Sequence, residues 1–176
     1  LRRLEAAYRE RNRRHFEIRR TIDLALLDPL ALMTLRTTGA CEFELPEALF
    51  DGDYPGHYLR RIKTVSLTID TGAVADAEGA VNATLTLLKD TTRISAETGD
   101  EYVRDEEDDD DRFVDNWVST SQIVTSHGQD DSGLFELNFR DERYLPFEGV
   151  GVISQWRLEL PTEFKQFDHD TISDVI

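Results

Sequence analysis

The chain has 176 residues, of which 39% are hydrophobic, and it carries a formal net charge of −16. This apolar content is enough for one ordinary domain with a packed core, which argues against disorder of the whole chain. The negative charge repels nucleic-acid phosphates and anionic lipids, so both are excluded as partners of most of the surface, whereas a basic protein partner fits it.

Cys41 is the single cysteine, so the chain cannot form an internal disulfide or a zinc site built on thiolates. No apolar run approaches the roughly 20 residues that span a bilayer, and the Arg-rich N-terminus lacks the apolar stretch of a signal peptide. The chain does not start with Met, and it stops on the strand-like SDVI. We therefore expect a piece of a longer protein, whose final strand is cut off after Ile176.

The first 39 residues are predicted to form a helical arm. Apolar residues recur at three- and four-residue steps over residues 1–28, which contain neither Gly nor Pro and so indicate one long helix. Asp28 and Pro29 are typical of an N-cap and a first helical position, and Gly39 of a helix end, so a second, shorter helix is expected between them.

Charge also divides the chain into two modules. Residues 1–36 contain nine Arg and five acidic residues, a net of +4, whereas residues 37–176 contain 11 basic and 31 acidic residues, a net of −20. Glutamates lie between the arginines of the first module, so its basic stripe is predicted to be solvated or to face another subunit, rather than to bind nucleic acid.

The segment LPEALFDGDYPGHY, residues 45–58, is predicted to form a tight corner between the helices and a sheet. Its prolines restrict φ, and Gly56 permits a positive φ. Tyr54, His57 and Tyr58 are expected to brace this corner by packing and hydrogen bonds rather than to perform chemistry.

Beyond this corner, apolar and polar residues alternate with the period of two that half-buried strands show. The alternating segments are KTVSLTI (63–69), ATLTL (83–87), SQIVTS (121–126), LFELNFR (134–140), QWRLEL (155–160) and TISDVI (171–176). No helical pattern of crossover length separates them, so the sheet is predicted to be antiparallel. The expected fold is α+β: a helical arm, residues 1–39, followed by a mainly antiparallel, jelly-roll-like β-sandwich over residues 40–176.

Residues 95–113 contain ten acidic residues in 19 and are predicted to form a solvated surface loop. Clustered carboxylates can bind calcium, but the run DEEDDDD lacks the alternating ligands and the glycine of a calcium loop, so calcium is the less favoured alternative. The functional interpretation of this loop is that it binds a basic partner, and that this binding depends on the salt concentration.

The sequence contains no recognisable pattern of a catalytic or cofactor site. The four histidines lack metal-binding spacing, no serine lies in a G-x-S-x-G turn, and a neighbouring glutamate disfavours the thiolate of Cys41. Gly149 and Gly151 precede a strand, so they present no helix N-terminus to a phosphate. Glycoside hydrolysis uses a pair of carboxylates. With 36 acidic residues in the chain, nearby pairs arise by chance, so such a pair is weak evidence for this activity. We expect no enzymatic activity, no cofactor and no metal ion.

Five long motifs resemble a known family over about residues 20–176. They are CEFELPEALFDGDYPGHYLRRIKTVSLTI, NATLTLL, DDDDRFVDN, DSGLFELNFRDERYLPFEGVGVISQWRLELP and FDHDTISDVI. They are similar to the C-terminal TcB-binding domain of the A component of tripartite Tc insecticidal toxins. The resemblance implies a non-catalytic assembly module of a secreted or cell-surface bacterial virulence factor.

The resemblance also implies partners. In this family the A component is a homopentameric, bell-shaped translocation channel, and its C-terminal domains form a funnel at the channel entrance. These domains dock the β-propeller of the B component, whose TcB–TcC cocoon encloses a toxic enzyme. Contact with a membrane would occur only through the channel part of the full-length protein.

The segment RDERYLPFEG, residues 140–149, is predicted to form a second corner. Its charged residues either form a structural salt-bridge cluster or belong to an exposed docking surface, and both interpretations stay open. The candidate partner-binding residues are Arg140, Asp141, Glu142, Arg143, Tyr144 and Phe147. The alternative function is a carbohydrate- or receptor-binding jelly roll, which requires Trp117 or Trp156 to line a groove instead of packing in the core.

Overall fold

The computed structural model describes residues 16–70, 83–98, 101–105, 110–125, 147–161 and 168–176. Its helices are α2 (Leu24–Leu27), α3 (Pro29–Thr38), α4 (Glu47–Asp51) and the 3-10 helix η1 (His169–Thr171). Its strands are β1 (Ala40–Leu45), β2 (Ile69–Asp70), β3 (Ala83–Arg93), β4 (Phe113–Thr125), β5 (Ile153–Glu159) and β6 (Asp174–Val175). Within these ranges, no helix has the length and apolar composition that a membrane crossing requires.

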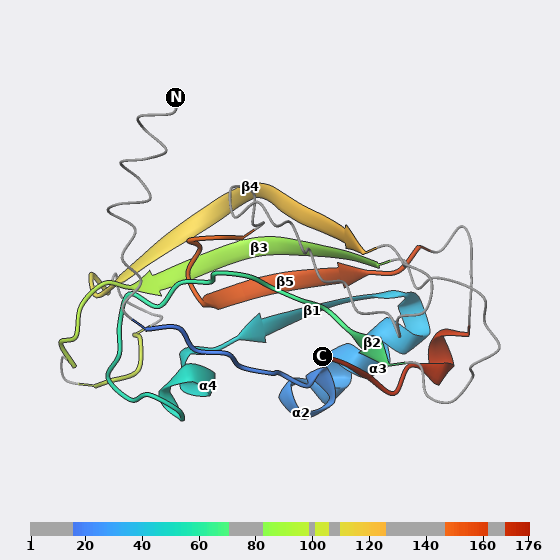
Figure 1. Cartoon of the computed structure of the whole chain (residues 1–176), viewed down its shortest axis with the longest axis horizontal. Helices are drawn as coiled ribbons and strands as arrows, with labels where there is room; N and C mark the ends of the chain where they lie inside the picture. Colours follow the sequence, from blue (N-terminus) through green and yellow to red (C-terminus); the bar gives the residue numbers. More distant parts are fainter. Residues whose placement is uncertain (1–15, 71–82, 99–100, 106–109, 126–146, 162–167) are drawn as a thin grey trace.

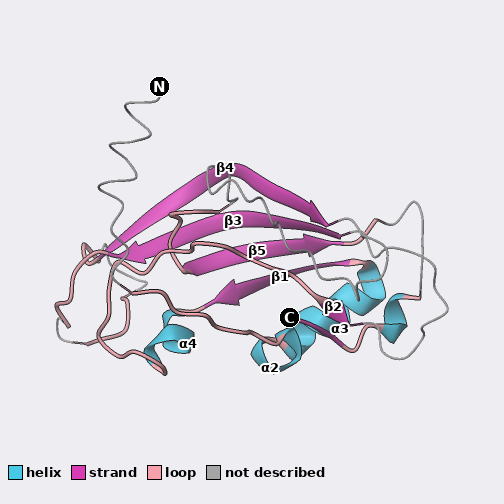
Figure 2. Ribbon diagram, viewed as in Figure 1, coloured by secondary structure: helices cyan, strands magenta, loops and turns pink. Residues whose placement is uncertain are grey.

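A four-stranded antiparallel sheet with the order β1-β5-β3-β4 forms one layer of the molecule (Figure 2). The helices α2 and α3 and the small antiparallel sheet of β2 and β6 lie on one side of it (Figure 1). The α+β class with a mainly antiparallel sheet is therefore confirmed. The second large sheet of a sandwich is not formed by the residues that the structure describes.

One hydrophobic core joins the sheet to the helices. Trp156 and Leu158 of β5 and Leu87 of β3 are each at most 2% exposed, and they belong to the same cluster as Leu32 and Leu35 of α3. The inward alternation predicted for ATLTL and QWRLEL is confirmed. Because α3 supplies buried residues to this core, it stabilises the sheet by removing apolar surface from water. The division into modules at residue 39 stays a prediction.

The helix α3 begins and ends where the sequence predicts. The Asp28 carboxylate accepts hydrogen bonds from the N–H groups of Leu30 and Ala31, at 3.1 and 3.0 Å, which satisfies two free donors of the first turn. Gly39 ends the helix with a φ of 80°, a conformation that costs little without a Cβ atom.

The prediction of one helix through residue 28 is wrong for residues 16–23, which form no helix, while residues 1–15 lie outside the described ranges. Side-chain contacts hold this segment against the corner that follows β1. The ring of Phe16 packs edge-on against Tyr54, with centroids 5.1 Å apart. Two ion pairs add to this contact, Glu17 with Lys63 and Arg20 with Asp53. These tertiary contacts outweigh the modest helix propensity of the segment.

The corner of residues 45–58 contains the short helix α4 and is braced as expected. The rings of Tyr54 and His57 lie 5.6 Å apart, and the Tyr54 carbonyl accepts a hydrogen bond from Arg60 at 2.6 Å. Tyr58, in contrast, is 45% exposed. Tyr54 and His57 therefore stabilise the corner by packing, whereas nearly half of Tyr58 is exposed to solvent.

Strand lengths differ from the predictions in several places. Of KTVSLTI, only Ile69 is in a strand, and it pairs with Val175 of TISDVI. Leu67 and Ile69 are still buried, so the alternation holds even where the ladder is absent. Two strand regions were missed: β1, whose CEFEL also alternates, and the start of β4 at Phe113. LFELNFR lies outside the described residues.

A register shift between Leu87 and Lys89 changes which side chains of β3 face the core. With one extra residue in the strand, Asp90 points inward, where it is 2% exposed and accepts a hydrogen bond from the Gly151 N–H at 2.7 Å. Arg93 consequently lies on the face of β3 opposite to Asp90, where it meets Glu47 at the start of α4. A Cβ at position 151 would lie 2.1 Å from the Thr91 carbonyl oxygen, so only glycine fits this close approach.

Candidate partner-binding surface

Five of the six partner-binding residues proposed from the sequence, residues 140–144, lie outside the described ranges. The sixth, Phe147, has a φ of 65° and is 4% exposed. Its ring packs edge-on against Trp156, with centroids 4.8 Å apart. Phe147 is therefore a core residue that offers little surface to a partner in this structure. Partner contact by the segment 140–147 stays a prediction.

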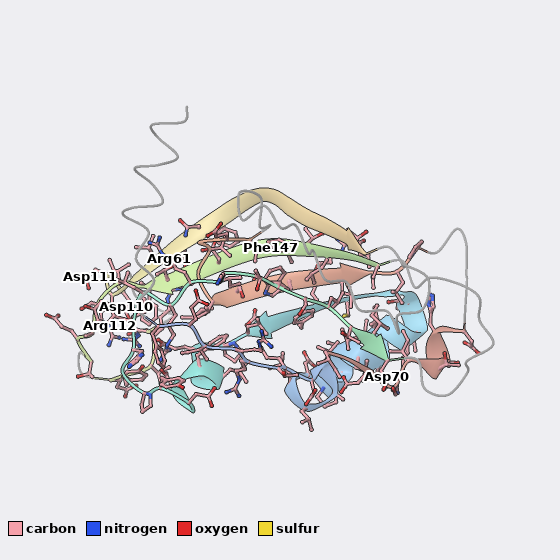
Figure 3. The ribbon with its side chains drawn as sticks, viewed as in Figure 1. Arg61, Asp70, Asp110, Asp111, Arg112 and Phe147 are labelled. Atoms are coloured by element: carbon pink, nitrogen blue, oxygen red, sulfur yellow. The ribbon has the colours of Figure 1, made fainter. Side chains whose placement is uncertain are left out.

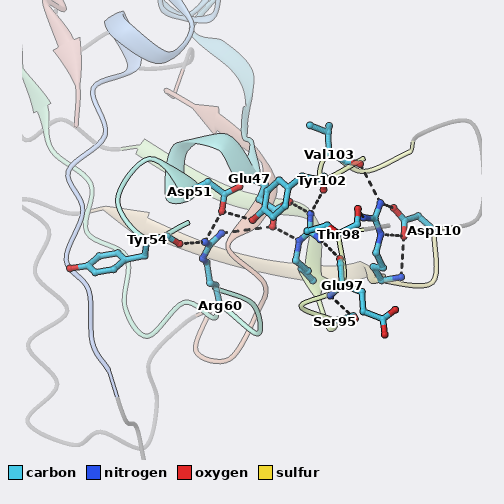
Figure 4. A network of polar contacts seen from close by, with 12 residues as sticks. Glu47, Asp51, Tyr54, Arg60, Ser95, Glu97, Thr98, Tyr102, Val103 and Asp110 are labelled. Carbon is cyan, nitrogen blue, oxygen red and sulfur yellow. Dashed lines mark hydrogen bonds and ion pairs between the residues drawn. The ribbon is translucent and has the colours of Figure 1, made fainter. Parts of the chain in front are cut away.

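A network of ion pairs and hydrogen bonds lies at the end of the sheet where β3 finishes and β4 begins (Figures 3 and 4). The segments that meet there are residues 46–60, 94–98, 101–105 and 110–113. The charged residues labelled at this end in Figure 3 include Asp110, Asp111 and Arg112. Side-chain hydrogen bonds and ion pairs join the loops at this end to one another.

Arg93 is the centre of this network. Its side chain is 3% exposed, and its Nε and Nη2 donate to the two carboxylate oxygens of Glu47 at 2.7 and 2.8 Å. Nη2 also donates to the Tyr102 carbonyl at 2.5 Å, and the guanidinium lies 4.4 Å from the ring centroids of Tyr102 and Phe113. The hydrogen bond to Glu47 raises the pKa of Arg93. The buried guanidinium of Arg93 is thus paired with a carboxylate, hydrogen-bonded to a carbonyl and stacked on aromatic rings. These contacts hold the segments that contain Glu47 and Tyr102 in place.

Arg60, just after the corner, binds both α4 and the backbone that follows α4. Its Nη2 donates to the Asp51 carboxylate at 2.7 Å and to the Tyr54 carbonyl at 2.6 Å (Figure 4). The Asp51 carboxylate also accepts the Tyr102 hydroxyl at 2.8 Å. Through Asp51, the loop before β2 and the loop after β3 are therefore connected.

Arg112 organises the acidic loop. Its guanidinium donates to the Asp110 carboxylate, with the shortest distance 2.6 Å, and holds the pKa of that carboxyl well below its usual range. It also donates to three backbone carbonyls, those of Thr98, Glu101 and Val103. The described part of the segment predicted as a solvated loop is therefore tied down by arginine. Residues 106–109, on which the calcium alternative depends, lie outside the described ranges.

Apolar side chains are exposed around this network. They are Tyr58, Leu59, Ile94, Val103 and Val114, with exposed fractions from 41% to 69%, and we call them the loop platform. Backbone hydrogen bonds bring their segments together: Leu59 N–H donates to the Arg93 carbonyl at 2.9 Å, and Ile94 N–H donates to the Arg112 carbonyl at 2.7 Å. The loop platform is thus a set of exposed apolar side chains on segments that a buried polar scaffold holds together.

Asp115 on β4 forms a second polar cluster beside the first. Arg104 donates to both of its oxygens, at 2.7 and 2.9 Å, Thr91 donates its hydroxyl at 2.6 Å, and the Lys89 ammonium lies 3.1 Å away. The Arg104 hydrogen bonds, with those of Thr91 and Lys89, hold the pKa of Asp115 well below its usual range.

Replacing Asp115 by asparagine is expected to reduce stability near neutral pH but not in acid. Because the pKa of Asp115 is lower in the folded than in the unfolded chain, its ionised form stabilises the fold above pH about 4, and this contribution is lost as pH falls below that. Thermal unfolding of both proteins between about pH 7 and pH 2 checks this. Glu159→Gln is the control, since the pair of Glu159 with Arg157 is exposed. A pH-independent difference between Asp115→Asn and the parent would contradict the assignment.

The two tryptophans have opposite environments. Trp156 is 2% exposed, whereas Trp117 is 77% exposed, with the Lys89 ammonium 4.9 Å from its ring centroid. A groove of about 470 Å³ lies beside β1. It is lined by Leu27, Asp28, Glu42, Phe43, Glu44, Pro46, Leu88, Gln155 and Trp156. Trp156 lines this groove but is 2% exposed, and Trp117 is not among the lining residues, so neither tryptophan offers the groove the open ring that the carbohydrate-binding alternative requires.

The thiol of Cys41 is 5% exposed and points to no nucleophilic chemistry. Burial first, and then the carboxylates of Asp28 and Glu42, raise its pKa to about 11, so it is protonated at neutral pH. Within the described ranges, no group of three or more His, Cys, Asp or Glu side chains is arranged to hold a metal ion.

The network around Arg93 and Glu47 was not predicted from the sequence. A signal was present, because Arg93 follows an alternating apolar strand and Glu47 begins a short helix after Pro46. Their pairing joins residues 46 positions apart, however, and depends on the register shift in β3. Sequence spacing alone therefore does not predict it.

Comparison with known proteins agrees with the motifs. A family model described as the Tc toxin complex TcA C-terminal TcB-binding domain matches residues 1–176. The chain is 39% identical over 181 residues to toxin subunit YenA2 of Yersinia entomophaga, an alignment that covers 100% of this chain and 13% of that protein. The chain thus spans a small part of the length of this relative. It belongs to the family of C-terminal TcB-binding domains of Tc toxin A subunits.

Proposed function

We propose that this chain is a non-catalytic assembly module of a Tc toxin A subunit and that it binds the B component. Its membership of a family of TcB-binding domains is the observation that carries this proposal. In the full-length, secreted toxin, five copies would surround the entrance of the translocation channel and dock the β-propeller of the B component.

Charge supports a protein partner. Residues 37–176 have a net charge of −20, which favours a partner with basic or mixed charge and disfavours nucleic acid. Attraction between exposed charges accelerates encounter, and it is screened by salt beyond about 8 Å at physiological ionic strength. The apolar side chains of the loop platform would then hold the complex together once it has formed.

A binding experiment with the purified B component of the same toxin complex tests the proposal. The chain is expected to bind it, with an association rate that falls as salt rises and a dissociation rate that changes less. The measurement is biolayer interferometry from low to high salt, with an unrelated β-propeller protein as the control. Absence of binding to the B component at every salt concentration would contradict the proposed function.

A further inference from the structure

We infer that the B component docks on the loop platform, at the sheet end where β3 finishes and β4 begins, through an apolar patch ringed by lysine or arginine. This inference rests on the proposed function. It names the surface that makes the contact and the chemistry of the partner surface that fits it.

The loop platform is rigid before any partner arrives. Arg93, Arg60 and Arg112 each bind a carboxylate and at least one backbone carbonyl of a neighbouring loop. Loops ordered on folding lose little further conformational entropy on binding, so more of the contact energy contributes to affinity. Exposed apolar side chains on such a scaffold resemble the central part of a protein interface, which is apolar and surrounded by charge.

Leu59 adds an independent observation. Its φ is 55°, in the left-handed region that a branched side chain such as leucine adopts at a cost in stability, and yet its side chain is 49% exposed. The hydrogen bond from its N–H to the Arg93 carbonyl holds this conformation. Glycine would relieve this strain, whereas leucine keeps a half-exposed apolar side chain at the position. Strain of this kind concentrates at binding sites.

Charge defines the partner. The arginines of the scaffold are paired, whereas the exposed acidic residues Glu97, Glu101 and Asp111 lie in the same loops as Ile94 and Val103. The outward charge around the loop platform is therefore negative. An apolar partner surface with a basic rim is complementary to it, and an acidic rim would be repelled.

Two variants test the apolar contact without disturbing the scaffold. Leu59→Gly and Val103→Ser are each expected to weaken the B-component complex by at least about tenfold in Kd, as loss of an interface anchor does. Leu59→Gly should at the same time have an equal or higher melting temperature, because it removes a strained conformation. The matched control is Leu26→Ser, since Leu26 is an 82% exposed leucine on α2, outside the loop platform, and should leave Kd unchanged.

A third variant tests the charge. The double change Glu97→Gln and Glu101→Gln should slow association at low salt several-fold and leave dissociation nearly unchanged. If the parent chain binds the B component and Leu59→Gly and Val103→Ser bind equally well, the docking surface is wrong and the proposed function stands. If the parent chain does not bind, the proposed function itself fails. A Leu59→Gly chain that melts at a lower temperature than the parent would contradict the strain at Leu59.

Discussion

Replacing Trp156 by alanine is expected to lower the free energy of unfolding by about 3 to 5 kcal/mol. The side chain is 2% exposed, lies beside Leu87 and Phe43 in the sheet register, and packs edge-on against Phe147. Its Nε1 donates to the Ser154 hydroxyl at 2.8 Å. Truncation would leave a cavity that this rigid sheet cannot close. Urea unfolding followed by far-UV circular dichroism measures the change.

The second tryptophan provides the control for this prediction. Trp117→Ala removes an equally large side chain that is 77% exposed, so it should change stability by about 1 kcal/mol or less, the range of its cation–π contact with Lys89. The two variants also separate the fluorescence of the chain into a buried and an exposed emitter. Similar losses of stability for both variants would show that Trp156 does not lie in the core.

Replacing Glu47 by glutamine is expected to destabilise the fold by about 3 kcal/mol, because it leaves the buried guanidinium of Arg93 without its carboxylate. Arg93 is 3% exposed and Glu47 is 13% exposed at the side chain, so water cannot substitute for the lost charge. Arg60, 3.8 Å from the same carboxylate, would lose a partner too. Chemical unfolding gives the loss, and the midpoint should shift without a large change in slope.

A double variant separates the cost of an unpaired buried charge from the net contribution of the ion pair. Glu47→Leu combined with Arg93→Met removes both charges and fills their space, so this chain should be more stable than Glu47→Gln alone. Glu44→Gln serves as the surface control, since Glu44 is an exposed acidic residue of β1. An unfolding midpoint of Glu47→Gln equal to that of the parent would rule out Arg93 as a buried, paired cation.

Local features of this protein were predictable from sequence because they depend on neighbouring residues. The N-cap at Asp28 and the helix end at Gly39 follow from side-chain oxygens and from φ preference. The alternation around Leu85 and around Trp156 follows from the pleat of a strand. The family was also recognisable, because long motifs carry more information than any short active-site pattern.

The sequence by itself thus determined the family, the α+β class with its antiparallel strands, and the inward-facing side chains of β5. That residues 16–23 form no helix depends on tertiary contacts, because their partners Tyr54, Lys63 and Asp53 lie far away in the sequence. Tertiary structure also decided that Arg93 meets Glu47, because one extra residue of β3 relative to β5, between Leu87 and Lys89, reverses the facing of the rest of β3. Both outcomes depend on contacts between residues far apart in the chain, whose energies exceed the local preferences that a sequence pattern expresses.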